Sequence, residues 1–211
     1  MTPSVELLWV TQDAERALLY AARVSSDQEN TDPGLLRYLI ANRHWSPFEL
    51  ASACFEVTTS RAIAHQIIRH RSFSFQEFSQ RYASPSDAIV YPARKQGATN
   101  RQATTEDVDD PLQEWWTAAQ CRMIDLAFEY YEKAIDAGIA RESARFILPE
   151  STVTKIIIAG TLRSWIHYFE LRCDPHTQLE HRILAEAMRE GLAAHFPTVA
   201  EACGWHAGVT L

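Results

Sequence analysis

Residues 51–81 read ASACFEVTTSRAIAHQIIRHRSFSFQEFSQR, and this stretch holds three successive patterns. Apolar and polar residues alternate over residues 51–59, which predicts a half-buried strand. Thr59 or Ser60 can cap the helix that an apolar stripe predicts next. Gln66 and His70 would share a face of that helix at i,i+4 spacing, so the segment that starts at Arg69 is predicted to begin at the helix C-terminal end and to continue as an extended stretch. A strand, a helix and an extended segment in so short a span indicate a mixed α and β fold.

The rest of the chain continues this mixture, with helix dominant. Strands are predicted at residues 5–10 and 152–159, and helices at 13–24, 33–40, 111–137, 141–146, 162–172 and 175–195. In the longest helix Asp110 is the predicted N-cap, Gln113 its capping-box partner and Gly138 the stop. Asp174 is the predicted N-cap of the last helix. Residues 93–109 are polar and lack a period, so they predict an exposed loop.

Composition limits the classes of protein that fit this chain. Its 211 residues, of which 46% are hydrophobic, can bury one sizeable core, and one domain is favoured over two. The formal net charge of −7 makes the surface repel polyanions, so a role in coating nucleic acid is disfavoured. The basic residues must therefore act locally, as a pocket within an acidic body.

Cysteine use and the absence of long apolar runs indicate where the chain works. The four cysteines are widely spaced without a C-x-x-C pair, which indicates reduced thiols and no metal site. The first residues lack a basic region followed by an apolar run, so no signal peptide is predicted. No stretch approaches the roughly 20 apolar residues of a membrane span. We expect a cytoplasmic protein with no membrane partner.

Residues 69–81 gather the side chains that could carry chemistry. They hold three arginines, a histidine, a glutamate and three serines among aromatic residues. Forked guanidinium donors, hydroxyls and flat apolar surfaces together suit a planar ligand that bears phosphate. Basic residues beside a helix end are also commonly solvated and favoured by the helix dipole, which would explain Arg69 and Arg71 alone. That alternative explains Glu77 and Arg81 less well.

The helix predicted at residues 162–172 separates its polar groups between two faces. Arg163, His167 and Glu170 fall on one face at 100° per residue. Arg172 points the opposite way, among aromatic residues. An arginine there needs an anion or a planar acceptor, because leaving it unpaired would cost several kcal/mol. A snorkelling side chain or a buried ion pair with a glutamate would also satisfy it.

Taken together, these motifs resemble those of the flavin-dependent thymidylate synthases. The core match is Arg69-His70-Arg71, then seven residues, then Ser79, with Glu77 and Arg81 in the family positions. The other matching segments, in family order, are HWSPFE at 44–49, ARFILP at 144–149, LRSW at 162–165 and LR at 171–172. The matching segments spread over most of the chain.

This resemblance implies an activity and an assembly. The activity is reductive methylation of dUMP to dTMP, with methylenetetrahydrofolate as carbon donor and NADPH reducing a bound FAD, without a protein nucleophile. The assembly is a homotetramer with shared active sites. With the patterns above, we expect an α+β, helix-dominated single domain over residues 1–211, with a central, largely antiparallel sheet.

The resemblance also implies roles for residues that match by position. The dUMP contacts it implies are Gln66, Arg69, Glu77, Ser79, Gln80, Arg81, Arg145 and Arg172. The FAD contacts it implies, some of them from a neighbouring subunit, are Ser46, Arg69, His70, Arg71, Glu77, Thr161, Arg163, His167 and His176. His44 is implied to lie near the flavin or the folate. Arg172 is the implied catalytic residue, and Arg81 and Arg145 are implied to clamp the phosphate.

Two other functions stay open at this point. A single-stranded RNA-binding module could use Arg69, Arg71 and the nearby phenylalanines as a stacking platform, although the net charge opposes it. A flavin oxidoreductase acting on another nucleotide would need much the same residues. Both alternatives place the chemistry around residues 69–81.

Overall fold

The computed structural model describes residues 2–24, 32–98, 104–105 and 108–205. The chain divides into two compact units. Unit 1 consists of Met1–Pro3, Thr58–Ile67 and Glu77–Ile156, and unit 2 of Ser4–Val57, Ile68–Gln76 and Ile157–Leu211. The chain thus enters each unit more than once. The expectation of a single domain over residues 1–211 stays a prediction.

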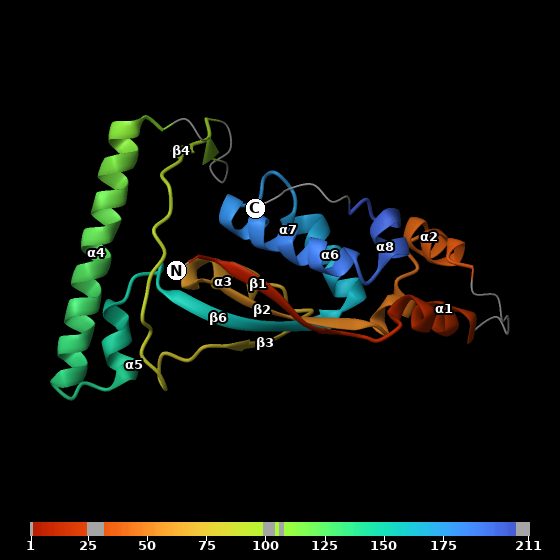
Figure 1. Cartoon of the computed structure of the whole chain (residues 1–211), viewed down its shortest axis with the longest axis horizontal. Coiled ribbons are helices and arrows are strands. Elements are labelled where there is room, and N and C mark those ends of the chain that lie inside the picture. The colour runs from red at the N-terminus through yellow and green to blue at the C-terminus, as the bar shows by residue number, and fades with distance from the viewer. Residues whose placement is uncertain (1, 25–31, 99–103, 106–107, 206–211) are drawn as a thin grey trace. The chain divides into compact units, whose positions relative to one another are not determined.

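Unit 2 is built on a four-stranded sheet, in which neighbouring strands run in opposite directions (Figure 1). The strands, in sheet order, are β1 (Ser4–Val10), β2 (Ser52–Ser60), β6 (Val153–Thr161) and β3 (Ser74–Glu77). Both β2 and β6 continue into unit 1. The predicted strands and the extended segment, which forms β3, are therefore confirmed, as is the antiparallel sheet of an α+β fold. The placement of Arg69 and His70 on the end of the preceding helix is wrong, because that helix ends at Ile67.

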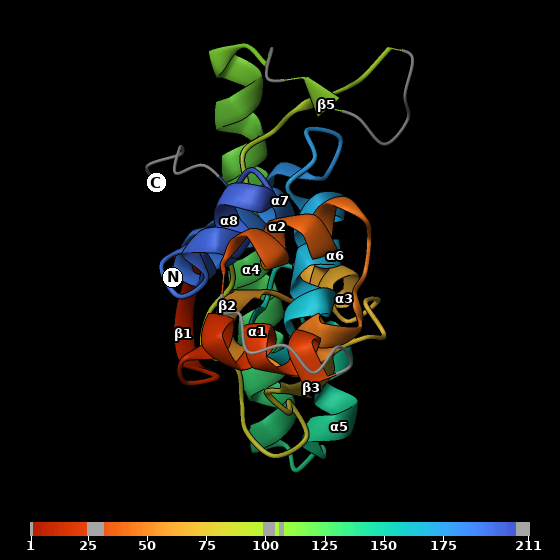
Figure 2. The same ribbon diagram turned by 90° about the vertical axis from the view of Figure 1, so that its right-hand side faces the viewer.

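Helices complete unit 2 (Figure 2). They are α1 (Ala14–Val24), α2 (Gly34–Ala41), the 3-10 turn η1 (Ser46–Glu49), α6 (Leu162–Arg172), α7 (Leu179–Ala193) and α8 (Pro197–Ala202). Helix α7 contacts both α6 and strand β1. The core of this unit contains fully buried aromatic side chains, among them Phe55, Trp165, Tyr168 and Phe196. These helices confirm the helix-dominated prediction.

Helix α6 begins and ends where the sequence predicts. Its N-cap is Thr161, whose hydroxyl accepts a hydrogen bond from the Ser164 amide at 3.4 Å. Immediately before the cap, a Cβ on Gly160 would lie 2.4 Å from the Phe73 ring, so only glycine lets that ring lie against the strand. Phe73 in turn packs edge to face on Trp165, with ring centroids 4.5 Å apart. The start of α6 is thereby fixed in unit 2.

Helix α7 starts later than predicted. The sequence predicts Asp174 as its N-cap, but the helix begins at Leu179 with Gln178 as N-cap. Asp174 instead accepts a hydrogen bond from the His176 amide at 2.8 Å, which makes an Asx turn. A helix cap and an Asx turn use the same side-chain acceptor, so the two look alike in sequence.

Unit 1 is organised around one long helix. Its elements are α3 (Arg61–Ile67), β4 (Lys95–Gln96), β5 (Thr104–Thr105), α4 (Asp110–Asp136), α5 (Arg141–Ala144) and the 3-10 turn η2 (Arg145–Ile147). Tyr131 and Ala134 of α4 pack with Ala144 in the core of this unit. Gly138 follows α4 with φ of +85°, as a helix stop requires.

Three predictions for unit 1 are wrong in detail. The N-cap of α4 is Asp109 rather than Asp110, because the Asp109 carboxylate accepts from the Leu112 amide at 3.0 Å. Gln113 is not a capping-box partner, since its side-chain oxygen accepts from the Ala93 amide at 2.9 Å. The segment at 93–109, predicted as a loop, contains the antiparallel pair β4–β5, and its residues 99–103 and 106–107 lie outside the described residues.

Two kinds of feature are absent from the described residues. No helix among them is long and apolar enough to cross a membrane. In the same part of the chain, no three side chains of the His, Cys, Asp and Glu type are grouped so that they could hold a metal ion.

Candidate functional site

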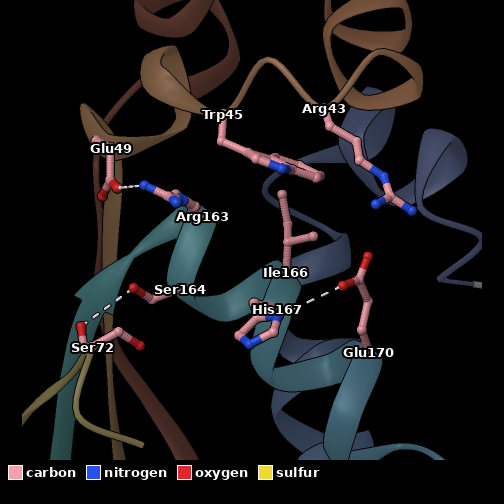
Figure 3. A pocket seen from close by; sticks show the side chains of 9 residues that line it. All are labelled: Arg43, Trp45, Glu49, Ser72, Arg163, Ser164, Ile166, His167 and Glu170. Atoms are coloured by element: carbon pink, nitrogen blue, oxygen red, sulfur yellow. Dashed lines mark hydrogen bonds and ion pairs between the residues drawn. The ribbon is translucent and has the colours of Figure 1, made fainter.

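Unit 2 contains a cavity of about 580 Å³ between α6 and the segment that leads into η1 (Figure 3). Its lining consists of Arg43, Trp45, Glu49, Ser72, Arg163, Ser164, Ile166, His167 and Glu170. The lining combines cationic, acidic and hydroxyl groups with one broad indole. Figure 3 shows the Trp45 ring facing Ile166 across the space. A flat ligand with polar edges fits this combination of groups.

The α6 side of the cavity confirms the predicted helix face. Arg163, His167 and Glu170 all line it, as the 100° spacing indicates. His167 Nδ1 lies 3.8 Å from a Glu170 carboxylate oxygen, and both side chains are mostly exposed, so this pair contributes little to stability. On the other side Arg43 has a φ of 56°, an uncommon backbone conformation for a residue other than glycine.

Glu49 is a site residue that the sequence did not single out. Its carboxylate accepts from an Arg163 guanidinium N–H at 2.7 Å and from the Thr161 hydroxyl at 2.8 Å. These contacts lower the pKa of Glu49, the Thr161 hydrogen bond more than the Arg163 one. Glu49 belongs to the HWSPFE segment, which by itself looks like a capped helix start. The signal was its place in that segment.

Arg172 and His70 meet on the other face of α6. Arg172 Nε donates to His70 Nε2 at 2.7 Å. Burial, followed by the charges of Arg172 and His167, lowers the pKa of His70 to about 4. His70 is therefore neutral at physiological pH, and its Nε2 is an acceptor. The structure gives Arg172 a histidine partner, which neither of the sequence alternatives included.

The other predicted residues of unit 2 lie outside the cavity lining. Of the implied FAD contacts in this unit, Arg163 and His167 line the cavity and Thr161 adjoins it through Glu49. Those outside the lining are Ser46, Arg69, His70, Arg71 and His176. His176 Nδ1 lies 2.8 Å from an Asp174 carboxylate oxygen. His44 is exposed, with its ring edge to face on Tyr38.

Unit 1 holds the remaining implied contacts. They are Gln66, Glu77, Ser79, Gln80, Arg81 and Arg145. The structure assigns Glu77 a local role, because one of its oxygens accepts from the Thr154 hydroxyl at 2.9 Å and from an Arg61 N–H at 3.2 Å. Arg81 pairs with Glu142 at 3.2 Å, with both side chains more than half exposed. An exposed pair of this kind gives way easily to a stronger anion.

Gln80 is buried in unit 1 and carries a side-chain donor that a ligand could use. Only 3% of its surface is exposed, yet its side-chain nitrogen makes no hydrogen bond with any residue that the structure describes. A buried donor without a partner costs about 1–3 kcal/mol. A bound ligand that offers an acceptor would remove that cost. Gln80 directly follows Ser79, whose hydroxyl accepts from the Arg81 amide at 3.3 Å.

The predicted site residues therefore form two groups, each described within its own unit. Arg69 and Arg172 belong to unit 2, whereas Arg81 and Arg145 belong to unit 1. In unit 2 the structure brings together the α6 face and the cavity, and separately Arg172 with His70. In unit 1 Gln80 is buried and Arg81 is exposed.

Comparison with known proteins adds independent findings. The family model of the thymidylate synthase complementing protein matches residues 6–198. A flavin-dependent thymidylate synthase from Synechocystis is 49% identical over 193 residues, which cover 90% of each chain. A probable flavin-dependent thymidylate synthase from Paramecium bursaria Chlorella virus 1 is 48% identical over 197 residues, which cover 91% of each chain.

Solved structures are similar over nearly the whole chain. The UMP/dUMP methylase PolB from Streptomyces cacaoi, bound with 5-Br dUMP, has a TM-score of 0.83 at 31% identity and covers 95% of this chain and 94% of its own. The same methylase bound with 5-Br UMP has a TM-score of 0.85 at 32% identity, over 97% of this chain and 95% of its own.

Proposed function

Because the chain belongs to the thymidylate synthase complementing protein family, we propose that it methylates dUMP to dTMP in a flavin-dependent reaction. The observation that carries this proposal is the family match over residues 6–198, joined to 49% identity with a flavin-dependent thymidylate synthase. Similarity to a methylase that binds brominated UMP and dUMP supports a pyrimidine nucleotide as substrate. The methyltransferase activity thus follows from the whole chain rather than from one motif.

The flavin in this proposal is FAD. The donor set fits it, because Arg163 and His167 line a cavity of about 580 Å³ beside the flat Trp45 indole. Sites for small molecules commonly have such volumes, roughly 300–1,000 Å³. When bound, FAD supplies the redox chemistry that carries reducing equivalents from NADPH to the pyrimidine. The implied contacts outside the lining, such as Arg69 and Arg71, would serve the same cofactor in this chain or a neighbouring one.

The dUMP contacts in unit 1 include two arginines for the phosphate and two other side chains, Gln80 and Glu77, for the rest of the nucleotide. Arg81 and Arg145 would clamp the phosphate, with charge-assisted hydrogen bonds of about 1.5–3 kcal/mol each. Arg81 would then leave Glu142, its exposed partner. Gln80 would donate to the nucleotide through its buried side-chain nitrogen, which has no partner among the described residues. Glu77 would keep one oxygen for Thr154 and offer the other to ligands.

Arg172 is the catalytic residue of the proposal. Its guanidinium would meet the edge of the uracil and stabilise negative charge at N3 and the neighbouring oxygen. Such preorganised donors commonly contribute a few kcal/mol to lowering a barrier. The charge polarises the ring toward reduction.

The reaction as proposed needs no protein nucleophile. Burial raises the pKa of Cys173 to about 11 and that of Cys203 to about 12, and it also raises the pKa of Cys54. The thiolate is the nucleophilic form of cysteine, so these three thiols are protonated and inert at neutral pH. Ser79 fits a binding role, since its hydroxyl accepts from the chain's own Arg81 amide.

The proposal extends to co-substrates and assembly. Methylenetetrahydrofolate would donate the carbon and NADPH the reducing equivalents, with His44 near the flavin or the folate. A homotetramer with shared active sites would let one chain supply contacts that another chain lacks. The exposed position of His44 is compatible with access for a second substrate.

A product assay tests the activity directly. The FAD-loaded protein is incubated with NADPH, methylenetetrahydrofolate and either dUMP or UMP, and the methylated nucleotide is identified by mass spectrometry. We expect dTMP from dUMP only when the flavin, NADPH and folate are all present. Flavin oxidation by a different nucleotide, without dTMP, would favour the flavin oxidoreductase instead. Tight, steeply salt-dependent binding of single-stranded RNA would favour the RNA-binding module.

A further inference from the structure

The contact between Arg172 and His70 joins residues 102 positions apart in the sequence. Both side chains are partly buried. Arginine is a cation and histidine becomes one when it is protonated, so a close pair of them requires a reason. The reason lies in the surroundings of His70, which is half-buried and cannot easily carry a proton.

Aromatic side chains fix the orientation of the His70 ring. Its ring lies edge to face on Tyr168, with centroids 4.8 Å apart, and on Phe73 at 6.5 Å. Tyr168 is buried and its hydroxyl is 2.9 Å from Nε2 of His181, a residue that is 0% exposed. The Phe73 ring in turn lies against Gly160, where any side chain would collide with it. His70 therefore rests on a rigid set of rings.

We propose that His70 is a positioning residue for Arg172: its Nε2 accepts the Arg172 Nε–H and thereby turns the Nη1 and Nη2 edge toward the pyrimidine. This inference rests on the proposed function, which places Arg172 at the uracil. A guanidinium has five N–H donors in a fixed planar fork. With the Nε–H directed to His70, the two Nη groups form a forked donor whose plane is set by the histidine ring. That fork matches N3 and a neighbouring carbonyl oxygen of uracil once N3 has lost its hydrogen, because neutral uracil presents a donor at N3 and offers the fork only the oxygen.

The device depends on His70 remaining neutral. With Nε2 as the acceptor, the proton of the ring must lie on Nδ1. Protonation would remove the acceptor and place two cations side by side. Burial together with Arg172 and His167 opposes that protonation. An arginine alone would have to be ordered by the ligand each time it bound, at a cost in side-chain entropy.

Two substitutions separate the acceptor from the ring. His70→Phe keeps an aromatic ring on Tyr168 and removes the acceptor. His70→Gln offers a side-chain oxygen at about the same reach as Nε2. This inference replaces the FAD contact that the family resemblance implies for His70, because its Nε2 is already used by Arg172. For the FAD-loaded protein we therefore expect His70→Phe to weaken dUMP binding roughly 10-fold and to lower kcat by roughly 30-fold, without loss of flavin. His70→Gln should recover most of both losses.

A double-mutant cycle shows whether His70 acts through Arg172. The dissociation constant of dUMP is measured by calorimetry for the FAD-loaded wild type, His70→Phe, Arg172→Ala and the double variant. We expect His70→Phe to have less than about a twofold effect in the Arg172→Ala background. Nitrogen NMR of the wild type should show an unprotonated Nε2 on His70, a signal assigned by its loss in His70→Gln.

The outcomes are distinct. If the wild type binds dUMP and His70→Phe binds it equally well, or if His70→Phe has its full effect without Arg172, the inference is wrong. Loss of flavin from His70→Phe, with unchanged turnover per bound flavin, would instead make His70 a flavin contact and overturn the inference. If the wild type neither binds dUMP nor makes dTMP, the proposed function fails and the inference fails with it.

Discussion

Burial keeps two histidines of unit 2, His70 and His181, uncharged. The pKa of His70 is lowered to about 4 and that of His181 to about 3, and burial is the largest cause for both. Each stays neutral in the folded chain at a pH at which the unfolded chain binds a proton. Their contribution to stability is fully present above the unfolded pKa of about 6.5 and is lost as the pH falls through the folded pKa.

This difference predicts a pH-dependent stability. We expect the free energy of unfolding, measured by urea titration, to fall as the pH is lowered from about 7 to about 5, because the unfolded state binds more protons. In His70→Gln this fall should be smaller. The exposed His195 offers a matched control, and His195→Gln should leave the fall unchanged. An equal pH dependence in wild type and His70→Gln would contradict the burial argument.

Arg81 is exposed and free to exchange one anion for another. We expect Arg81→Ala to weaken dUMP binding by about 10- to 100-fold, the loss of one charge-assisted hydrogen bond, while flavin content stays the same. Arg141→Ala removes another exposed arginine from unit 1 and should leave dUMP binding unchanged. Calorimetry on the FAD-loaded proteins gives both constants. A dissociation constant unaffected by Arg81→Ala would exclude the phosphate clamp.

At the scale of elements, local signals predicted the helices and strands well. Helix α6 has the bounds that its pattern predicts, residues 162–172, and the structure adds Thr161 as its N-cap. The start of α7 was missed because Asp174 can serve a turn as well as a cap. The N-cap of α4 is Asp109, one residue before the predicted Asp110, because both residues carry a carboxylate that could cap the helix. Neighbouring residues of like chemistry leave boundaries open.

The junction between β6 and α6 depends on one missing side chain. Gly160→Ala would place a Cβ about 2.4 Å from the Phe73 ring, so the ring or the strand must move. We expect the free energy of unfolding to fall by about 1–3 kcal/mol, as overpacked cores do.

A smaller ring partner provides the control. Phe73→Leu costs stability by itself, but in that background Gly160→Ala should cost much less, because the crowded atoms are gone. Urea denaturation of the four proteins gives the coupling. Purely additive losses would mean that Phe73 is not what requires glycine at this position.

At the scale of the molecule, the proposed homotetramer rests on the family resemblance alone. Four copies of this 24.0 kDa chain would form the proposed homotetramer. Light scattering on the FAD-loaded protein should give a mass four times that of one chain. A monomer that makes dTMP at full rate would show that one chain suffices for the site.

The long-range part of the site could not be predicted from local pattern. The contact of Arg172 with His70 spans 102 residues, and that of Arg163 with Glu49 spans 114. Periodicity placed Arg163 and Arg172 on opposite faces of one helix, which the structure confirms. It could not say what each face meets, because that depends on how distant segments pack. Family motifs supplied residue roles that no local rule contains.

One measurement tests the central claim most directly: turnover of dUMP to dTMP by Arg172→Ala, with flavin absorbance recorded on the same sample. The account predicts a loss of at least about 100-fold in kcat while the oxidised-flavin spectrum persists, because Arg172 acts at the pyrimidine and not at the cofactor. Turnover close to that of the wild type, or loss of the flavin spectrum together with turnover, would contradict it.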